Sequence, residues 1–407
     1  MQIFSLLVLA VPLVVTALPA VSQDRNSKLF AGFKDAKLTT SFGGHATCVS
    51  GIVPVTASAI NYHINLPPDF PQSQTPLTQL LQSINSVNST TAASLAGAAT
   101  NISDTFDIDS RLCYPTGSSP NTRLIQVLNH GGAFDMGYWD FYSQDYSYID
   151  AAAKNGYTTF AFSHLGTGNS AHPDGIQIVQ TSLQIQIAHE LIFLLRSGAL
   201  ASTAFEHVVG VGHSYGSQQT NAVSSLYPTS LDAIVLTGFT SDPAGEPVFF
   251  SGLNGIIANE ADPARFHGIP NTYVVPGTES SNQFGFFYYP NFAQDVLDAS
   301  EARKQSLSVG ELVTLAHVSR PAPAYTSPVF VLLGEFEMPT CWGNCTAVGA
   351  LADLGSDWAE ITLKQFYPNT MHGKTQIFAG LGHGLNLHYG AGDVYRSIFN
   401  FIIETKL

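Results

Sequence analysis

The pentapeptide Gly-His-Ser-Tyr-Gly at residues 212–216 carries the clearest chemistry in the chain. A valine-rich run at residues 208–211 leads directly into it, which is typical of a buried strand that turns sharply into a helix. A serine hydroxyl is a weak nucleophile near neutral pH, so it must be lifted clear of its neighbours and placed next to a base. The flanking glycines leave room for the crowded backbone of such a turn. The sequence therefore predicts that Ser214 is a catalytic nucleophile.

A nucleophilic serine needs a general base, and after a turn of this kind the chain order is serine, acid, histidine. The base should follow the last strand of the sheet, which we expect at Thr375–Phe378. The segment Gly-Leu-Gly-His-Gly at residues 380–384 comes next. We therefore predict that His383, between two glycines, is the base. His388, five residues later, is the alternative.

The acid that orients this base should lie in the loop after the preceding strand, which we expect at Val329–Leu333. Gly-Glu-Phe-Glu follows at residues 334–337. In chains of this class the acid is usually the third residue after the glycine, which selects Glu337. A glutamate is one methylene longer than an aspartate and can still accept the imidazole N–H. Glu335 and Asp242 are the alternatives.

The oxyanion of the reaction needs two backbone N–H groups aimed at the place where negative charge develops. One is the N–H of Tyr215, which directly follows the nucleophile. The other should come from the loop after an early strand, where Asn-His-Gly-Gly-Ala-Phe occupies residues 129–134. We favour the N–H of Gly132, with Ala133 as the alternative. His130 is expected to brace this loop rather than to act as a second base.

The elements that must position these residues alternate between strands and amphipathic helices from residue 123 onward. Alternation of this kind predicts an α/β fold whose mostly parallel sheet is covered by helices on both faces. The expected strands are Leu124–Leu128, Thr158–Phe162, His207–Val211, Ala233–Thr237, Val329–Leu333 and Thr375–Phe378, with a helix at Ile178–Leu195. Ahead of them, Val53–Ile64 and Thr105–Arg111 are expected to pair, with a partly helical segment at Leu77–Ala99 between them.

Residues 242–322 break the alternation and contain clusters of aromatic residues, notably Phe249-Phe250 and residues 284–292. A long insert in a compact domain is usually functional. Its position predicts a lid over Ser214, with some of the aromatic side chains lining an apolar pocket. The catalytic core is then split into residues 46–241 and 323–407, on either side of the lid.

The N-terminus has the features of a secretion signal. Residues 4–15 are almost wholly apolar, which suits the apolar core of a signal peptide and is too short to span a bilayer. We predict a signal peptide at residues 1–17, cleaved after Ala17, with Ala20 as a second candidate. Residues 18–45 are expected to form an irregular leader.

Cysteines and glycosylation sequons support the same compartment. An even number of cysteines behind an export signal indicates two disulfides, although four cysteines allow three pairings. Cys341 and Cys345 could close a short local loop, and Cys48 and Cys113 would then pair by exclusion. The sequence also contains Asn-X-Ser/Thr sequons, at Asn88, Asn101 and Asn344.

The composition limits the partners. The net charge is −14 at pH 7 and only 11% of residues are charged, compared with about 25% in typical domains. A nucleic-acid partner would need a basic stripe, and the sequence has none. The cysteines lack the paired spacing of a zinc site. We therefore expect no metal, no organic cofactor, no nucleic acid and no stable membrane insertion. From the candidate nucleophile and the aromatic insert, we expect a small apolar or aromatic ester as the substrate.

Taken together, several motifs of the chain resemble those of one protein family. They are His130-Gly131-Gly132, Tyr138-Trp139-Asp140, Leu165-Gly166-Thr167-Gly168, the segment around Ser214, Gly334-Glu335-Phe336-Glu337 and Gly382-His383-Gly384. In this order, over roughly residues 120–400, the chain resembles α/β-hydrolase-fold proteins, and more narrowly the secreted fungal serine hydrolases and esterases of that superfamily. The resemblance implies that Ser214, Glu337 and His383 form a catalytic triad. The chain departs from it in using Glu337 where aspartate is commoner, and Ser163-His164 where Asp-Arg is often found.

These observations predict a secreted serine hydrolase that cleaves a carboxylic ester through an acyl-enzyme, with a lactone or a natural-product ester as variants. Three other functions stay open. The first is a biosynthetic catalyst for lactone opening, cyclisation or C–C cleavage. The second is an exo-peptidase, which would need acidic residues in the lid, where Glu260 and Asp262 are the closest pair. The third is a non-catalytic binding protein, which the complete triad argues against.

Overall fold

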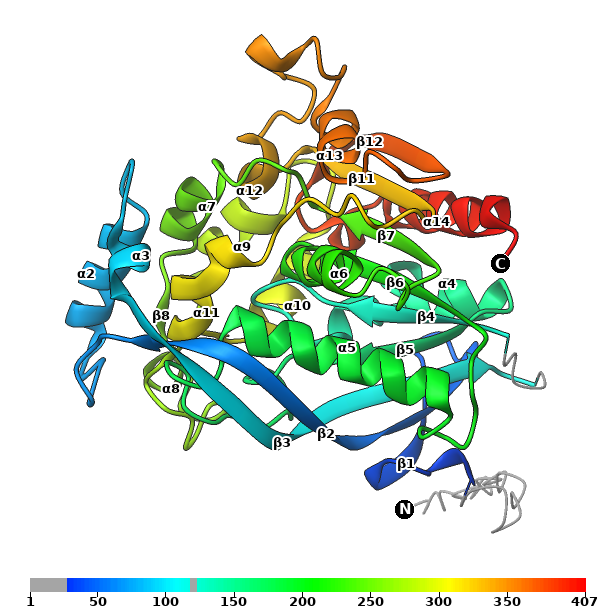
Figure 1. Ribbon diagram of the computed structural model, residues 1–407, viewed down its shortest axis with the longest axis horizontal. Coiled ribbons are helices and arrows are strands. Elements are labelled where there is room, and N and C mark those ends of the chain that lie inside the picture. Colours follow the sequence, from blue (N-terminus) through cyan, green and yellow to red (C-terminus); the bar gives the residue numbers. More distant parts are fainter. Residues whose placement is uncertain (1–27, 118–122) are drawn as a thin grey trace, which may run out of the picture.

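A twisted sheet forms the centre of the molecule, with helices on both sides (Figure 1). The computed structural model describes residues 28–117 and 123–407. Within these residues, the central sheet has nine strands in the order β1-β2-β3-β5-β4-β6-β7-β11-β12. The parallel strands are β4 (Leu124–Asn129), β5 (Thr158–Phe162), β6 (His207–His213), β7 (Ala233–Thr237), β11 (Val329–Phe336) and β12 (Gly373–Gly382). The predicted α/β fold with a mostly parallel sheet is confirmed.

Five of the parallel strands, β4, β5, β6, β7 and β11, are buried on both faces along nearly their whole length, which explains their apolar sequences, whereas the edge strand β12 is mostly only partly buried. Along β4, for example, Ile125 and Val127 pack into one core, while Leu124 and Leu128 pack into the other. The first core lies under α5 (Thr181–Ser197), α6 (Tyr215–Leu226) and α13 (Trp358–Phe366). The second lies under α4 (Tyr148–Lys154) and α14 (Ala391–Thr405). Helices therefore cover the sheet on both faces.

The N-terminal part of the sheet is antiparallel and longer than expected. β2 (Ala46–Ile64) and β3 (Ala96–Pro115) pair along nearly their whole length and extend beyond the sheet as an arm (Figure 1). The arm ends in α2 (Gln74–Ile84) and α3 (Thr91–Leu95). Cys48 and Cys113 face each other in this pair and form a disulfide.

The expectation of an irregular leader over residues 18–45 is wrong for part of that range. Lys34–Thr40 forms β1, an edge strand that pairs with β2. Its sequence is polar and its side chains are mostly exposed, so it lacks the alternation by which half-buried strands are recognised. Backbone hydrogen bonds to β2 hold it in place instead.

Residues 242–322 contain helices and a small antiparallel sheet, β10-β9-β8. We call this segment the cap. Its helices are α7 (Glu246–Leu253), α8 (Ala258–Ala261), α9 (Glu279–Phe286), α10 (Gln294–Arg303) and α11 (Val309–Thr314), and its strands are β8 (Ile256–Ile257), β9 (Tyr273–Val275) and β10 (Leu307–Ser308). The strands are too short to show a periodic pattern, so the sequence did not predict them. A further helix, α12 (Met338–Cys341), follows β11, and short 3-10 turns lie at Met136–Trp139, Gln144–Tyr146, Leu315–His317, Gly349–Leu351 and Leu385–Leu387.

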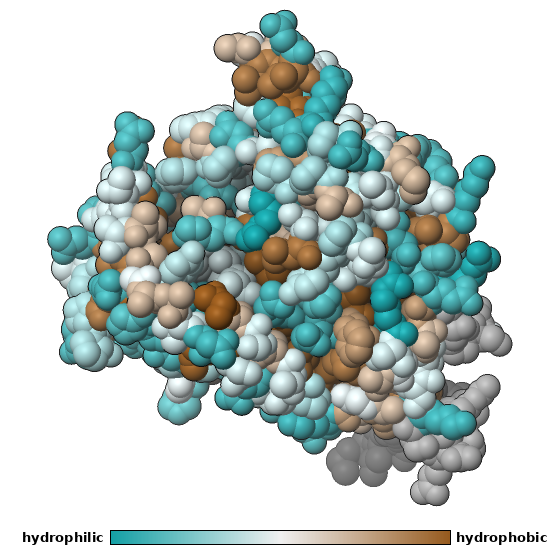
Figure 2. Space-filling view, viewed as in Figure 1, coloured by the Kyte–Doolittle hydropathy of each residue, from teal (hydrophilic) through white to brown (hydrophobic). Residues whose placement is uncertain are grey.

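The predicted signal peptide, with its candidate cleavage sites at Ala17 and Ala20, lies outside the described residues. Among those that are described, no helix is long and apolar enough to cross a membrane. Apolar residues appear as separate patches on the face in Figure 2. The side chains of Asn88, Asn101 and Asn344 are all exposed, as a glycan acceptor requires, and their glycosylation stays a prediction.

Candidate active site

Ser214 lies on a strained turn between β6 and α6. Its backbone has φ 53° and ψ −120°, in the left-handed region that non-glycine residues rarely adopt. Two glycines make the turn possible. A Cβ at Gly212 would lie 2.6 Å from the Cα of Ser217, and one at Gly216 would collide with the carbonyl oxygens of Asn129 and His130. The sequence around Ser214 therefore builds a turn that presents the hydroxyl at the end of the strand.

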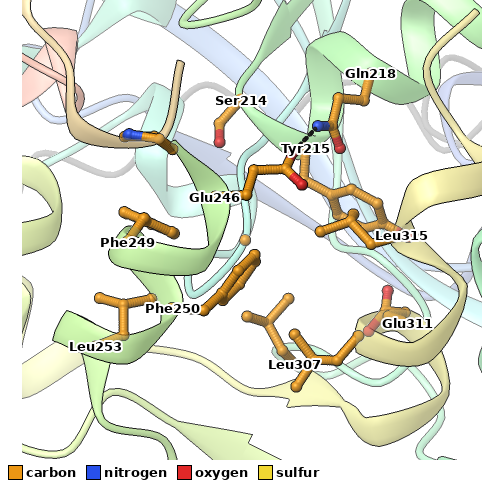
Figure 3. A pocket seen from close by; sticks show the side chains of 13 residues that line it. Ser214, Tyr215, Gln218, Glu246, Phe249, Phe250, Leu253, Leu307, Glu311 and Leu315 are labelled. Atoms are coloured by element: carbon orange, nitrogen blue, oxygen red, sulfur yellow. Dashed lines mark hydrogen bonds between the residues drawn. The ribbon is translucent and has the colours of Figure 1, made fainter. Parts of the chain in front are cut away.

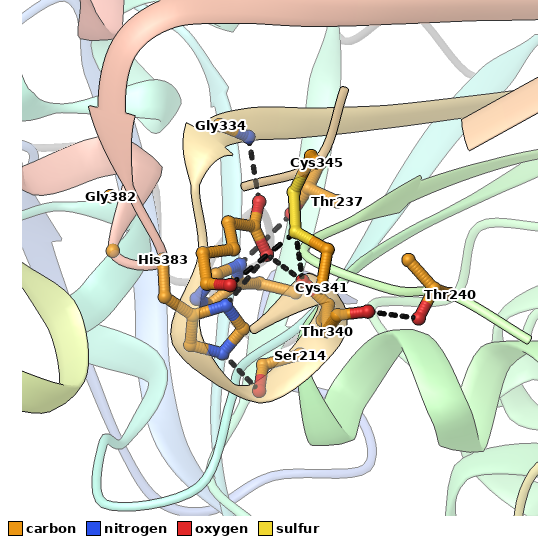
Figure 4. Close-up of polar contacts among 12 residues, drawn as sticks. Ser214, Thr237, Thr240, Gly334, Thr340, Cys341, Cys345, Gly382 and His383 are labelled. Atoms are coloured by element: carbon orange, nitrogen blue, oxygen red, sulfur yellow. Dashed lines mark hydrogen bonds and ion pairs between the residues drawn. A yellow bond between two sulfur atoms is a disulfide. The ribbon is translucent and has the colours of Figure 1, made fainter. Parts of the chain in front are cut away.

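Ser214, His383 and Glu337 form one hydrogen-bonded chain (Figure 4). The Oγ of Ser214 is 2.7 Å from Nε2 of His383. The Nδ1 of His383 is 2.8 Å from Oε2 of Glu337, and the side chains of both residues are fully buried. The three residues follow β6, β12 and β11, whose carboxyl ends lie at one edge of the sheet. The predicted nucleophile, base and acid are thus brought together.

Glu337 accepts three hydrogen bonds, which fix its orientation. Its Oε1 accepts from the Gly334 N–H at 2.7 Å, and its Oε2 accepts from the Thr340 hydroxyl at 2.8 Å as well as from His383. The Cys341–Cys345 disulfide closes the loop that follows. This loop returns to the strand end, where the Cys345 N–H donates to the Glu335 carbonyl at 2.8 Å.

The alternative residues have other partners. Glu335 accepts a hydrogen bond from the Gly380 N–H at 2.9 Å and so braces β12 against β11. Asp242 accepts one from the Ala244 N–H at 2.9 Å. His388 accepts from the Tyr288 N–H at 3.0 Å, and its Nδ1 lies 2.9 Å from the Gly384 carbonyl. Burial lowers the pKa of His388 to about 4, so this imidazole is a neutral structural group.

The predicted oxyanion-hole residues border the same cavity as Ser214, since Gly132 and Tyr215 both line it. A Cβ at Gly131 would lie 3.0 Å from the Cβ of Ser214, so glycine lets this loop approach the nucleophile closely. Ala133, the alternative, has a left-handed backbone, with φ 65°, and its carbonyl accepts the Gln305 N–H. It is not among the residues that line the cavity.

His130 and His164 hold the loop at residues 129–134 in place. The Nδ1 of His130 is 2.8 Å from the Gly131 carbonyl, and its Nε2 accepts from the His164 N–H at 3.0 Å. The two rings stack with centroids 3.7 Å apart. Burial lowers the pKa of both, that of His130 to about 4. His130 therefore has the bracing contacts that were expected of it, and the departure at His164 is accommodated by a neutral stacked pair.

The model of the Alpha/beta hydrolase family matches residues 127–394, more than half of the chain. The chain belongs to this family. Similar solved structures include a thermophilic esterase from Thermogutta terrifontis, 12% identical, with a TM-score of 0.48 over 74% of this chain and 94% of that one. A hydrolase from Pseudomonas aeruginosa PA01 is 13% identical, with a TM-score of 0.49 over 73% and 94%. No curated protein sequence matches the chain.

The cavity of this alpha/beta hydrolase lies between Ser214 and the cap (Figure 3). Its volume is about 40 Å³. Apolar side chains make up most of its wall: Phe249, Phe250, Leu253, Leu307, Leu312 and Leu315. Of the two aromatic clusters in the cap, the first thus lines the pocket. In the second, Phe286 packs in the core, with its ring centroid 6.0 Å from that of His383.

Two carboxyl groups in the cavity wall were not predicted. Glu246 accepts a hydrogen bond from Nε2 of Gln218 at 2.7 Å (Figure 3). Glu311 accepts from Nε2 of Gln184 and from the Ser308 N–H. Burial raises the pKa of each to about 7. The Ser-X-X-Glu sequence at 308–311 is a helix capping box and could have identified Glu311 as an N-terminal helix residue. No local signal marks Glu246.

No group of three or more histidine, cysteine or acidic residues is placed to hold a metal ion in the described part of this hydrolase. The pair on which an exo-peptidase would depend, Glu260 and Asp262, is not part of the cavity wall. Asp262 instead caps a turn, accepting from the Ala264 and Arg265 N–H groups.

Proposed function

We propose that this alpha/beta hydrolase is a secreted serine esterase in which Ser214, His383 and Glu337 act as nucleophile, base and acid. The hydrogen-bonded chain from Ser214 through His383 to Glu337 carries the proposal. Its geometry matches what nucleophilic activation of a serine requires. The apolar cavity beside Ser214 supports a substrate with an apolar acyl or alcohol group.

The first half-reaction forms an acyl-enzyme. Ser214 Oγ attacks the ester carbonyl carbon while Nε2 of His383 takes the hydroxyl proton. Glu337 holds the imidazole in the productive tautomer and balances its positive charge. The N–H groups of Tyr215 and Gly132 stabilise the oxyanion of the tetrahedral intermediate. His383 then returns the proton to the alcohol oxygen as the C–O bond breaks, and the alcohol leaves.

The second half-reaction uses water in place of the serine. His383 removes a proton from a water molecule, which attacks the acyl carbon through the same oxyanion geometry. The bond to Ser214 Oγ then breaks, the proton returns to this oxygen, and the carboxylic acid is released. Dehalogenase and epoxide hydrolase chemistry is disfavoured, because it needs a carboxylate at the position of Ser214.

Secretion is part of the proposal. The apolar N-terminal segment supports it, and so do the two disulfides, Cys48–Cys113 and Cys341–Cys345, because disulfides persist in oxidising compartments. Expression of the full chain in a secreting host, followed by N-terminal sequencing of the medium fraction, tests it. We expect the mature chain to begin after Ala17. Retention of an uncleaved chain in the cells would contradict secretion.

The catalytic proposal is tested with Ser214→Ala on a panel of aryl esters, lactones and aminoacyl amides. We expect ester hydrolysis in the wild type and a loss of about 10³-fold or more in the variant. The matched control is Ser217→Ala, on the same helix, whose hydroxyl donates to the Thr237 carbonyl and not to His383. Cleavage of amides or lactones without esters would favour the exo-peptidase or the biosynthetic catalyst. No turnover with any member of the panel would favour the binding protein.

A further inference from the structure

We propose that the arm made by β2, β3, α2 and α3 forms the distal half of the acyl-binding site, and that the esters cleaved at Ser214 carry long apolar acyl chains. This inference rests on the proposed esterase function. The arm lies wholly outside residues 127–394, the part of the chain that matches the family model. The proposal thus gives a binding role to a segment that contains none of the proposed catalytic residues.

The arm is packed directly against the cap. α2 contacts α7, and α3 contacts α11 (Figure 1). Gln74 at the start of α2 donates from Nε2 to the Gly255 carbonyl at 3.0 Å, and its Oε1 accepts from the Ile257 N–H at 2.9 Å. Leu77 and Leu80 of α2 share a small core with Ile257 and Val313 of the cap. The arm and the cap therefore form one packed unit over the active site.

A second, larger cavity lies between the arm and the cap. Its volume is about 360 Å³, compared with about 40 Å³ for the cavity at Ser214. The arm contributes Leu81, Ile84 and Ala92 to its wall, and the cap contributes the other side. The catalytic cavity by itself can hold only a short acyl group, so a longer chain would need this second space.

Phe250, Leu312 and Leu315 lie between the two cavities. All three line the catalytic cavity and the distal cavity, and Phe250 and Leu312 also border a small third cavity whose lining residues are all apolar or glycine. All three residues are only partly buried. The partition between the cavities is thus made of apolar side chains.

The chemistry of the walls selects an apolar chain. Among the described residues, no lysine or arginine lines either cavity. Glu246 lines both, but Gln218 engages its carboxyl group, and burial raises its pKa to about 7, so that it stays largely neutral in mildly acidic solution. The polar side chains on the arm side, Asn85 and Ser89, lie on the segment after α2. An acyl chain that passes Phe250 would bury its methylene groups against leucine, isoleucine and alanine side chains. Each buried methylene group would raise the affinity roughly fourfold.

The test compares p-nitrophenyl esters of increasing acyl length, from acetate to hexadecanoate, in the full-length enzyme. We expect kcat/KM to rise beyond butyrate and to peak at a long chain such as dodecanoate. Ala92→Trp fills the distal cavity and should lower the ratio of kcat/KM for dodecanoate to that for butyrate by about tenfold or more. Phe250→Ala removes the aromatic ring from the partition and should raise this ratio.

The matched control is Val87→Trp, which adds the same side chain to the arm at a position that is 92% exposed and lines neither cavity. It should leave the chain-length profile unchanged. Butyrate turnover and a thermal melt show whether each variant is folded. An unchanged dodecanoate-to-butyrate ratio in folded Ala92→Trp would overturn the inference while leaving the esterase proposal intact. Absence of hydrolysis with every ester in the wild type would instead overturn the proposed function.

Discussion

Replacing Glu337 with glutamine removes one acceptor from a carboxylate that serves three donors. The His383 imidazole and the Thr340 hydroxyl share Oε2, and the Gly334 N–H uses Oε1. A glutamine offers one oxygen and one NH₂ group. With its oxygen toward His383, the NH₂ group would face the Gly334 N–H, donor against donor. With its NH₂ group toward His383, Nδ1 must become an acceptor, and Nε2 then carries the proton.

The second orientation stops catalysis, because a protonated Nε2 cannot take the Ser214 proton. Swapping the acid for its amide in a triad of this type lowers kcat by about 10⁴-fold, which corresponds to about 5.5 kcal/mol of transition-state stabilisation. Both side chains are fully buried, and Glu337 is the acceptor that Nδ1 of His383 contacts among the described residues. We therefore expect Glu337→Gln to lose between about 10³-fold and 10⁴-fold in kcat.

The assay measures kcat on one p-nitrophenyl ester for Glu337→Gln and Glu335→Gln side by side, with circular dichroism to verify folding. Glu335→Gln is the matched control, because its oxygen can still accept the Gly380 N–H and should change kcat only a few-fold. A loss of less than about tenfold in folded Glu337→Gln would refute the assignment of the acid. Greater damage in Glu335→Gln would show that the acid is misplaced by two positions, and damage in neither would make Asp242 the candidate.

Two buried carboxyl groups and one disulfide should each have a measurable effect. Burial raises the pKa of Glu311 from 4.5 to about 7, so the stability contributed by its neutral form is full below pH 4.5 and is lost as the pH rises through about 7. This loss is at most roughly 3 kcal/mol. The free energy of urea unfolding should therefore fall more between about pH 5 and pH 8 in the wild type than in Glu311→Gln, which keeps the capping box and still contains the buried Glu246. Equal pH dependence in both would contradict this. Burial and the nearby Asp242 raise the pKa of Glu246 to about 7. The wild type should therefore lose kcat/KM for an apolar ester as the pH rises through about 7, so that the kcat/KM of Glu246→Gln divided by that of the wild type rises. A ratio that does not change with pH would show that Glu246 does not contact the substrate. Replacing both Cys48 and Cys113 by alanine removes a cross-link between residues 65 positions apart in the sequence. This double substitution should lower the free energy of unfolding by about 2–4 kcal/mol. An unchanged denaturation midpoint would mean that strand pairing alone holds β2 and β3 together.

The sequence predicted β4, β5, β6, β7 and β11 because each is buried on both faces along nearly its whole length and reads as an apolar run. It also predicted part of β12, an edge strand that is only partly buried. β5 and β7 have the predicted ends, Thr158–Phe162 and Ala233–Thr237. The strands that carry the candidate site were predicted too short. β6 continues to His213 and β11 to Phe336, since polar and glycine residues at a strand end still pair through their backbone. The candidate catalytic residues lie just beyond these ends, so knowing the strands was enough to place them.

Features that depend on distant contacts could not be predicted from local patterns. β1 is held by pairing with β2 and has no apolar face. Glu246 is the first residue of α7, and its place in the cavity wall depends on how the cap packs over Ser214. Each of these is a consequence of tertiary packing, which residue spacing does not encode.

Acylation of Ser214 is the step on which the proposed mechanism depends. Reaction with a fluorophosphonate, followed by proteolysis and mass spectrometry, shows which residue is the nucleophile. We expect a single stoichiometric adduct on the peptide that contains Ser214, none in Ser214→Ala, and much slower labelling in Glu337→Gln. An adduct on another residue, or an unlabelled wild type that still hydrolyses esters, would contradict this mechanism.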